Sequence, residues 1–69
     1  MEDIMTCPVI LIEEEDWIVA KEITTDIASQ GKTINEALAN LKEALELFYE
    51  DTPISKPRSF FTTTLEVCV

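Results

Sequence analysis

Residues Thr33 to Tyr49, TINEALANLKEALELFY, decide the fold because they predict an amphipathic helix with a defined start. The Thr33 hydroxyl can accept a hydrogen bond from a free amide of the first turn, and Glu36 can reach back to the Thr33 amide, which together form a capping box. Apolar side chains recur every three or four positions and predict one buried face: Ile34, Ala37, Leu38, Leu41, Ala44, Leu45 and Phe48.

The rest of the helix surface is polar and should face solvent: Asn35, Glu36, Asn40, Lys42, Glu43, Glu46 and Glu50. Pro53 disfavours helical angles at its predecessor and cannot extend the hydrogen-bond ladder. The helix is therefore predicted to end near Glu50 or Asp51.

Three strands are predicted before the helix, at residues 6–13, 16–23 and 27–30. The first two are joined by a short acidic connection, which predicts a hairpin. Val9 to Ile12 are consecutive aliphatic residues, and this pattern favours a central strand that is covered on both faces. Gly31, the one glycine, can adopt a positive φ and is predicted to do so in the turn that enters the helix.

A fourth strand is predicted over residues 58–69, which alternate with period two. Its predicted core face consists of Phe61, Thr63, Leu65, Val67 and Val69, and its semi-polar face of Thr62, Thr64, Glu66 and Cys68. The helix then forms a crossover, for which a right-handed connection is expected. The predicted fold is one α+β domain over residues 1–69, a two-layer sandwich with the order βββαβ.

The net charge of −9, from 14 acidic and 5 basic residues, argues against direct nucleic-acid binding, which depends on clustered Lys and Arg. It favours a basic protein partner, although an acidic composition can equally serve solubility alone. No apolar run approaches the ~20 residues of a membrane-spanning helix. With only Cys7 and Cys68 and no secretory leader, we expect a cytoplasmic protein with reduced thiols.

Candidate site residues gather at the first predicted turn, where Glu13, Glu14, Glu15 and Asp16 precede Trp17. Adjacent carboxylates on a turn spread outward, so a solvated turn is expected rather than a metal site. Trp17 fits either core packing, the first expectation, or an interface anchor. The run and Trp17 are the predicted partner-binding residues.

Leu47 and Phe60 fall outside the predicted core faces and are the predicted contacts of a homo-oligomer, which a chain of 69 residues needs to increase its buried surface. The chain has no histidine and no recognisable nucleophile with a base, so neither a catalytic residue nor a cofactor is predicted.

The segment Ser29 to Asp51, SQGKTINEALANLKEALELFYED, resembles the signature of the HicB-like antitoxin family, in which a strand ends in a QG-type turn before an EAL-N-KEAL-type helix. The resemblance implies a partial ribonuclease H fold with the same βββαβ order. The residues ITTDIA, from Ile23 to Ala28, depart from the Pro- and Gly-containing bend that family members often carry. Ribonuclease H carboxylates are absent from the inward strand positions, so a non-enzyme is expected.

Such an antitoxin binds and blocks a small, basic, HicA-like RNA-cleaving toxin. The resemblance is to a short, stand-alone domain without a DNA-binding extension, so autoregulation by direct DNA binding is not expected. The alternative from another class is a homo-oligomeric module that binds a different protein or a small ligand.

Overall fold

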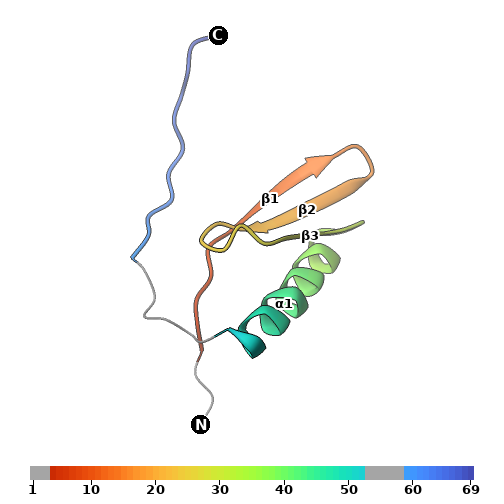
Figure 1. Ribbon diagram of the computed structural model, residues 1–69. Coiled ribbons are helices and arrows are strands. Elements are labelled where there is room, and N and C mark those ends of the chain that lie inside the picture. Colours follow the sequence, from red (N-terminus) through yellow and green to blue (C-terminus); the bar gives the residue numbers. More distant parts are fainter. Residues whose placement is uncertain (1–3, 53–58) are drawn as a thin grey trace.

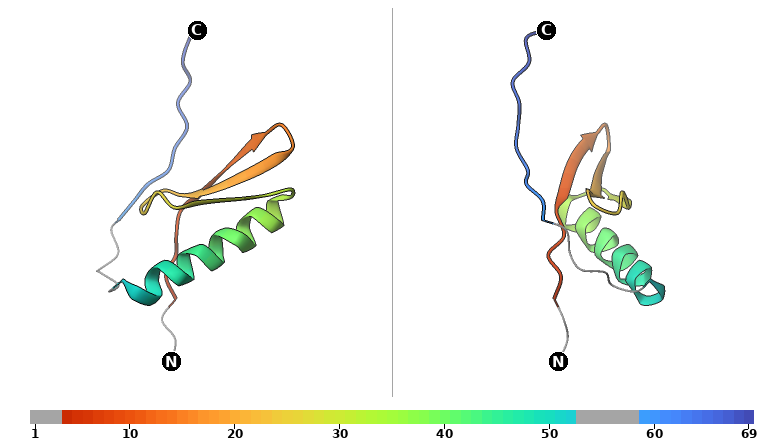
Figure 2. Two further views of the ribbon diagram at one scale, coloured as in Figure 1. Left: turned by 45° about the vertical axis from the view of Figure 1, so that its right-hand side comes forward. Right: turned by 60° about the vertical axis from the view of Figure 1, so that its left-hand side comes forward.

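The computed structural model describes residues 4–52 and 59–69 and contains three antiparallel strands followed by one helix (Figure 1). The elements are β1 (Val9–Glu14), β2 (Trp17–Glu22), β3 (Ala28–Gly31) and α1 (Ile34–Asp51). The strands lie in the order β1-β2-β3, and α1 crosses one face of the sheet, as the further views in Figure 2 show. The predicted α+β class and the order of these four elements are confirmed.

The helix begins and ends where the sequence predicts. The Thr33 hydroxyl accepts a hydrogen bond from the Glu36 amide at 3.1 Å, and α1 ends at Asp51 with Thr52 already extended. The reciprocal hydrogen bond of the capping box, from the Thr33 amide to the Glu36 carboxylate, does not form in the described part of the chain. A hydroxyl at the cap satisfies one of the free first-turn amides and so fixes the start of the helix.

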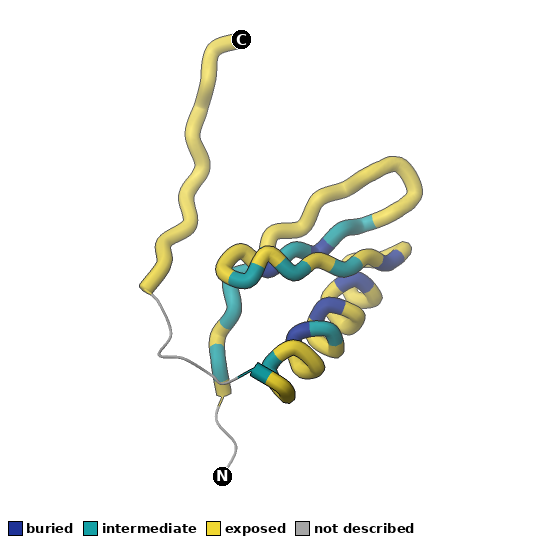
Figure 3. The backbone as a smooth tube through the Cα atoms, in the orientation of Figure 1, coloured by how far each residue is buried: buried dark blue, intermediate teal, exposed yellow. Residues whose placement is uncertain are grey.

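The core is small and lies between α1 and the two strands β2 and β3 (Figure 3). Its buried apolar members are Ala20, Ala37, Leu41 and Leu45. Ile34, Leu38 and Phe48 were predicted on the buried face but are exposed. For Leu38 the reason is geometric, because α1 packs mainly over β3 and β2 and leaves the β1 side of its apolar face uncovered, where Leu38 lies.

The prediction that the first strand is central is wrong, because β1 lies at an edge of the sheet. Leu11 pairs with Ala20 and therefore points to the helix side, whereas Ile12 pairs with Val19 and points to the opposite face. Both Leu11 and Ile12 are exposed. A run of aliphatic residues makes both faces of a strand apolar, but it does not supply the elements that would cover them.

The predicted fourth strand over 58–69 is also not formed. Position 58 lies outside the described residues, and residues 59–69, called here the C-terminal segment, have no strand pairing and stand apart from the sheet (Figure 1). Phe61, Leu65, Val67 and Val69 are exposed rather than part of the core. The order over the described residues is thus βββα, and the predicted crossover to a parallel fourth strand is absent from it. An alternating sequence allows a segment to pair as a strand, but the segment becomes a strand only where a sheet edge lies beside it.

Gly31 does not have the predicted positive φ. It is the last residue of β3 and lies directly against the first turn of α1, where an added Cβ would be 2.5 Å from the Ala37 nitrogen. The glycine is required by this close approach and not by a left-handed backbone.

The turn between β2 and β3 is organised by Glu22, a fully buried carboxylate that sequence patterning did not single out. It accepts hydrogen bonds from the amides of Thr24 and Thr25 at 2.9 and 2.8 Å and from both threonine hydroxyls. Burial raises the pKa of Glu22, but the hydrogen bonds from Thr25 and Thr24 outweigh it and hold the pKa below its ordinary value of 4.5.

We predict that Glu22→Gln lowers the free energy of unfolding by about 1.5–3 kcal/mol at pH 7, because a neutral amide replaces a charged acceptor. The depressed folded-state pKa means that the stabilisation is fully present above the unfolded value near 4.5 and is lost as pH falls through the folded value. Urea titrations at pH 7 and below pH 4.5 should therefore show the gap to the wild type narrowing in acid. A gap of constant size would contradict this account, and Glu13→Gln, at an exposed carboxylate, is the control.

Candidate functional site

The predicted acidic run forms the tip of the β1–β2 hairpin. Glu14 pairs with Trp17, and Glu15 and Asp16 make the connection between them, with Glu15 at a φ of 33°. All four carboxylates from Glu13 to Asp16 are exposed. Across the described ranges 4–52 and 59–69, no group of three or more acidic or thiol side chains is arranged to hold a metal ion. The tip is an exposed anionic surface.

Trp17 is not a core residue, contrary to the first expectation. Its side chain is 41% exposed on the sheet face that points away from α1. The Lys32 ammonium lies 5.8 Å from the centroid of the Trp17 ring, a cation–π distance. The structure therefore places an accessible aromatic ring beside the carboxylates of the hairpin tip, with Ile12 next to it on the same sheet face.

The two predicted oligomer contacts lie elsewhere. Gly31 pairs with Ile18, so α1 begins at the end of the sheet that carries the hairpin tip, and Leu47 lies toward the opposite end of the helix. Leu47 is 59% exposed, and Phe60 belongs to the C-terminal segment and is also exposed. Both side chains are accessible, as predicted, but they do not form one site with the hairpin tip.

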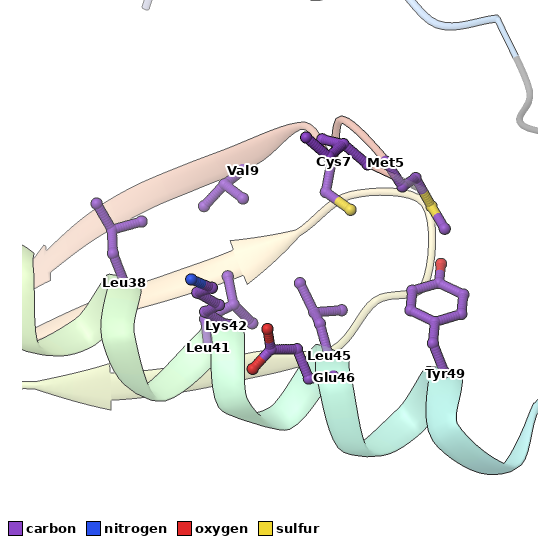
Figure 4. A pocket seen from close by; sticks show the side chains of 10 residues that line it. Met5, Cys7, Val9, Leu38, Leu41, Lys42, Leu45, Glu46 and Tyr49 are labelled. Atoms are coloured by element: carbon purple, nitrogen blue, oxygen red, sulfur yellow. The ribbon is translucent and has the colours of Figure 1, made fainter. Parts of the chain in front are cut away.

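Sequence patterning missed an apolar groove of about 660 Å³ between α1 and the chain that leads into β1 (Figure 4). Leu38, Leu41 and Leu45 line it from the helix, and Val9 and Cys7 line it from the other side. Lys42 and Glu46 add charge at its border, and Ile4, Met5 and Tyr49 complete the lining. The groove exists because α1 does not cover β1. A signal for it was present in the sequence, since the apolar face of the helix is wider than two short strands can cover.

The Cys7 thiol and the Tyr49 hydroxyl of the groove are both held in their neutral forms. Burial raises the pKa of the Cys7 thiol, and the nearby Glu22 charge raises it further. Burial likewise raises the pKa of Tyr49, with smaller contributions from Cys7 and Glu22. A thiol with a raised pKa is a poor nucleophile, so the groove is suited to apolar contact. Cys7 is half-buried and Cys68 exposed, and both are free in this structure.

A family model of unknown function, DUF7387, matches residues 3–58. The chain belongs to this family. The DUF7387 match covers all three strands, α1, the hairpin tip and the groove, and it stops before the C-terminal segment. No curated protein and no solved structure gives a significant match. None of the helices among the described residues combines the length and apolarity needed to cross a bilayer.

Proposed function

We propose that this DUF7387 protein is a HicB-like antitoxin that binds a small, basic, HicA-like toxin in the cytoplasm and occludes its RNA-cleaving site, without enzymatic activity of its own. The observation that carries the proposal is the hairpin tip, where four consecutive exposed carboxylates directly precede an accessible tryptophan on a chain of net charge −9. Aromatic anchors and complementary charge are the features that give an interface affinity and rapid association.

The fold is in keeping with this proposal. The observed βββα order agrees with the first four elements expected of a partial ribonuclease H-like domain. The QG turn and the helix that carry the resemblance to HicB-like antitoxins pack tightly here, with Gly31 against α1 and the Asn40 side chain donating to the Gln30 carbonyl at 2.8 Å. These residues hold the scaffold together, so the toxin contacts must come from the exposed surface.

The first experiment is co-expression with the product of the adjacent gene. We expect that product to be short, basic and histidine-containing, to arrest growth when expressed alone, and to be neutralised when this protein is present. An adjacent product that arrests growth without relief would refute inhibition in that pair. Absence of a neighbouring gene of this kind would remove the main support for the pairing.

The hairpin tip is tested by charge reversal. Glu13→Lys with Glu14→Lys should weaken toxin binding about tenfold or more, mainly through slower association, with the difference shrinking at high salt. The matched control is Glu43→Lys with Glu50→Lys, which makes the same change in net charge at exposed helix positions and should alter affinity less than about threefold. Equal losses in both variants would show that net charge and not the tip is recognised. Surface plasmon resonance at two salt concentrations measures both rates.

The alternative function, a homo-oligomeric module with a different protein or small-molecule ligand, is favoured by the exposed apolar C-terminal segment and the groove. Affinity capture from the protein's own cells separates the two functions. Recovery of an RNA-cleaving protein supports the antitoxin, and recovery of a protein without that activity supports the alternative.

A further inference from the structure

We propose that the C-terminal segment of one copy adds as a strand to the free edge of β1 in a second copy, with its apolar side chains in the partner's groove between β1 and α1. The result is a strand-exchanged homodimer with two four-stranded sheets. This inference rests on no property of the proposed toxin.

The C-terminal segment has the pattern of a strand but lacks a sheet. Phe61, Leu65 and Val67 share one parity and are 96%, 86% and 70% exposed. Within residues 4–52 and 59–69, no backbone hydrogen bond joins this segment to another part of the chain. Isolated extended backbone with one apolar face is stabilised when it joins an existing sheet edge, which supplies both hydrogen bonds and burial.

Of the two sheet edges, β1 offers the open one. β3 has only four residues, α1 packs closely against it, and the Asn40 side chain occupies the Gln30 carbonyl. β1 has six residues, begins after Pro8, and carries four consecutive aliphatic residues with no lysine or proline among them. Charged side chains, proline and covering elements are the devices that protect sheet edges. The charged side chains of β1 are Glu13 and Glu14 at its hairpin end, so among the described residues the edge from Val9 to Ile12 has no such protection.

The alternation of the C-terminal segment fits the two faces beside β1. The helix-side face of β1 carries Val9, which lines the groove together with Leu38 and Leu45. A strand added to this edge places alternate side chains on each face. The side chains of Leu65 and Val67 then point into the groove. Those of Thr62 and Thr64, at the alternate positions, point to the outer face.

A second copy is the occupant that the structure favours. The C-terminal segment runs away from the sheet in Figure 1, and it has no backbone hydrogen bond to β1 of its own chain among the described residues. Its 11 residues span roughly 36 Å when extended, against roughly 20 Å for the six residues of β1, so the strand pairing can run the whole edge. Among the described residues, the core of a single copy has only four buried apolar residues, and a second copy supplies the missing burial.

The test measures the mass of the full chain in solution by sedimentation or light scattering. The wild type is expected to be a dimer of twice the chain mass of 7.8 kDa. Leu65→Asp with Val67→Asp should raise the dimer dissociation constant about 10,000-fold, at about tenfold for each of the apolar side chains lost, because both copies lose Leu65 and Val67. Thr62→Asp with Thr64→Asp adds the same charge on the opposite parity and should leave the dimer within about threefold.

A mixing experiment shows that the contact is made between chains. Leu38→Asp alters the groove at a side chain that is already 38% exposed, so the domain should still fold, which circular dichroism verifies. Neither this variant nor Leu65→Asp with Val67→Asp should dimerise alone. A mixture of the two should form heterodimers, because one intact segment meets one intact groove.

Three results would overturn the proposal. The first is a wild type that stays monomeric with residues 59–69 protected from hydrogen exchange, since the segment then folds onto its own β1. The second is a monomer in which the segment becomes protected only with another protein. The third is a dimer that Leu65→Asp with Val67→Asp does not weaken.

Discussion

Leu41→Asp is expected to leave the protein unfolded at 25 °C. Among the residues that the structure describes, Leu41 is the largest fully buried apolar side chain, at 1% exposure, and it lies in the middle of α1 against β2 and β3. Removing it forfeits about 1.5–3 kcal/mol of burial. An aspartate there also has no basic partner in the small core, and an unpaired buried charge costs several kcal/mol more.

These costs exceed what a core of this size provides, since a domain below about 70 residues seldom has more than about 3–5 kcal/mol of stability from its core. Far-UV circular dichroism should lose the helical signal, and amide resonances should collapse to the random-coil range. Leu47→Asp is the matched control on the same helix, where the side chain is 59% exposed, and it should cost less than about 1 kcal/mol. A folded Leu41→Asp protein would mean that the buried face of α1 is oriented differently.

The elements that the sequence predicts well are those determined by local chemistry. The Thr33 cap, the end of α1 at Asp51 and the hairpin between β1 and β2 each depend on residues within a few positions of one another. Helix capping and the short separation of two β-rich runs are such local properties, so these predictions hold without knowledge of the tertiary fold.

The errors concern what lies beside each element, which local pattern does not encode. Val9 to Ile12 was expected to be central and forms an edge, and the segment around Leu65 was expected to be core and is exposed. The two errors share one cause, because a fourth strand on β1 would have covered the first and buried the second. The strand-exchanged dimer proposed above would satisfy both patterns with residues of a second chain.

The sequence predicts which residues form the hairpin tip, but not which of them are exposed together or which other residues form a groove. The acidic run at Glu13 and the position of Trp17 in a hairpin follow from the sequence, but the exposure of Trp17 depends on which sheet face α1 covers. The groove and the buried Glu22 depend on contacts between distant segments. Glu22 has a local signal in hindsight, because threonines two and three positions later can donate to it.

Gly31→Ala is expected to destabilise the domain by about 3 kcal/mol or more, the second large effect. The added Cβ would lie 2.5 Å from the Ala37 nitrogen and 2.8 Å from the Glu36 carbonyl carbon. Both are helix backbone atoms, which cannot move aside as a flexible side chain can. The first turn of α1 must therefore move away from β3, which weakens the contacts of Ala37 and Leu41 with the sheet together. The loss of stability is thus at the upper end of the range for overpacked cores.

The sign of this effect identifies the role of the glycine. At a φ that any residue can adopt, Gly→Ala without a clash stabilises a protein by about 0.4–1 kcal/mol, because it reduces the entropy of the unfolded chain. Gly31 has no positive φ, so only the contact with α1 can reverse that sign. Gly31→Asn separates the two explanations, since asparagine tolerates a left-handed backbone but carries the same Cβ. Urea denaturation should show Asn as harmful as Ala at position 31, whereas Ser29→Ala, on the same face of β3, should change stability by less than about 1 kcal/mol.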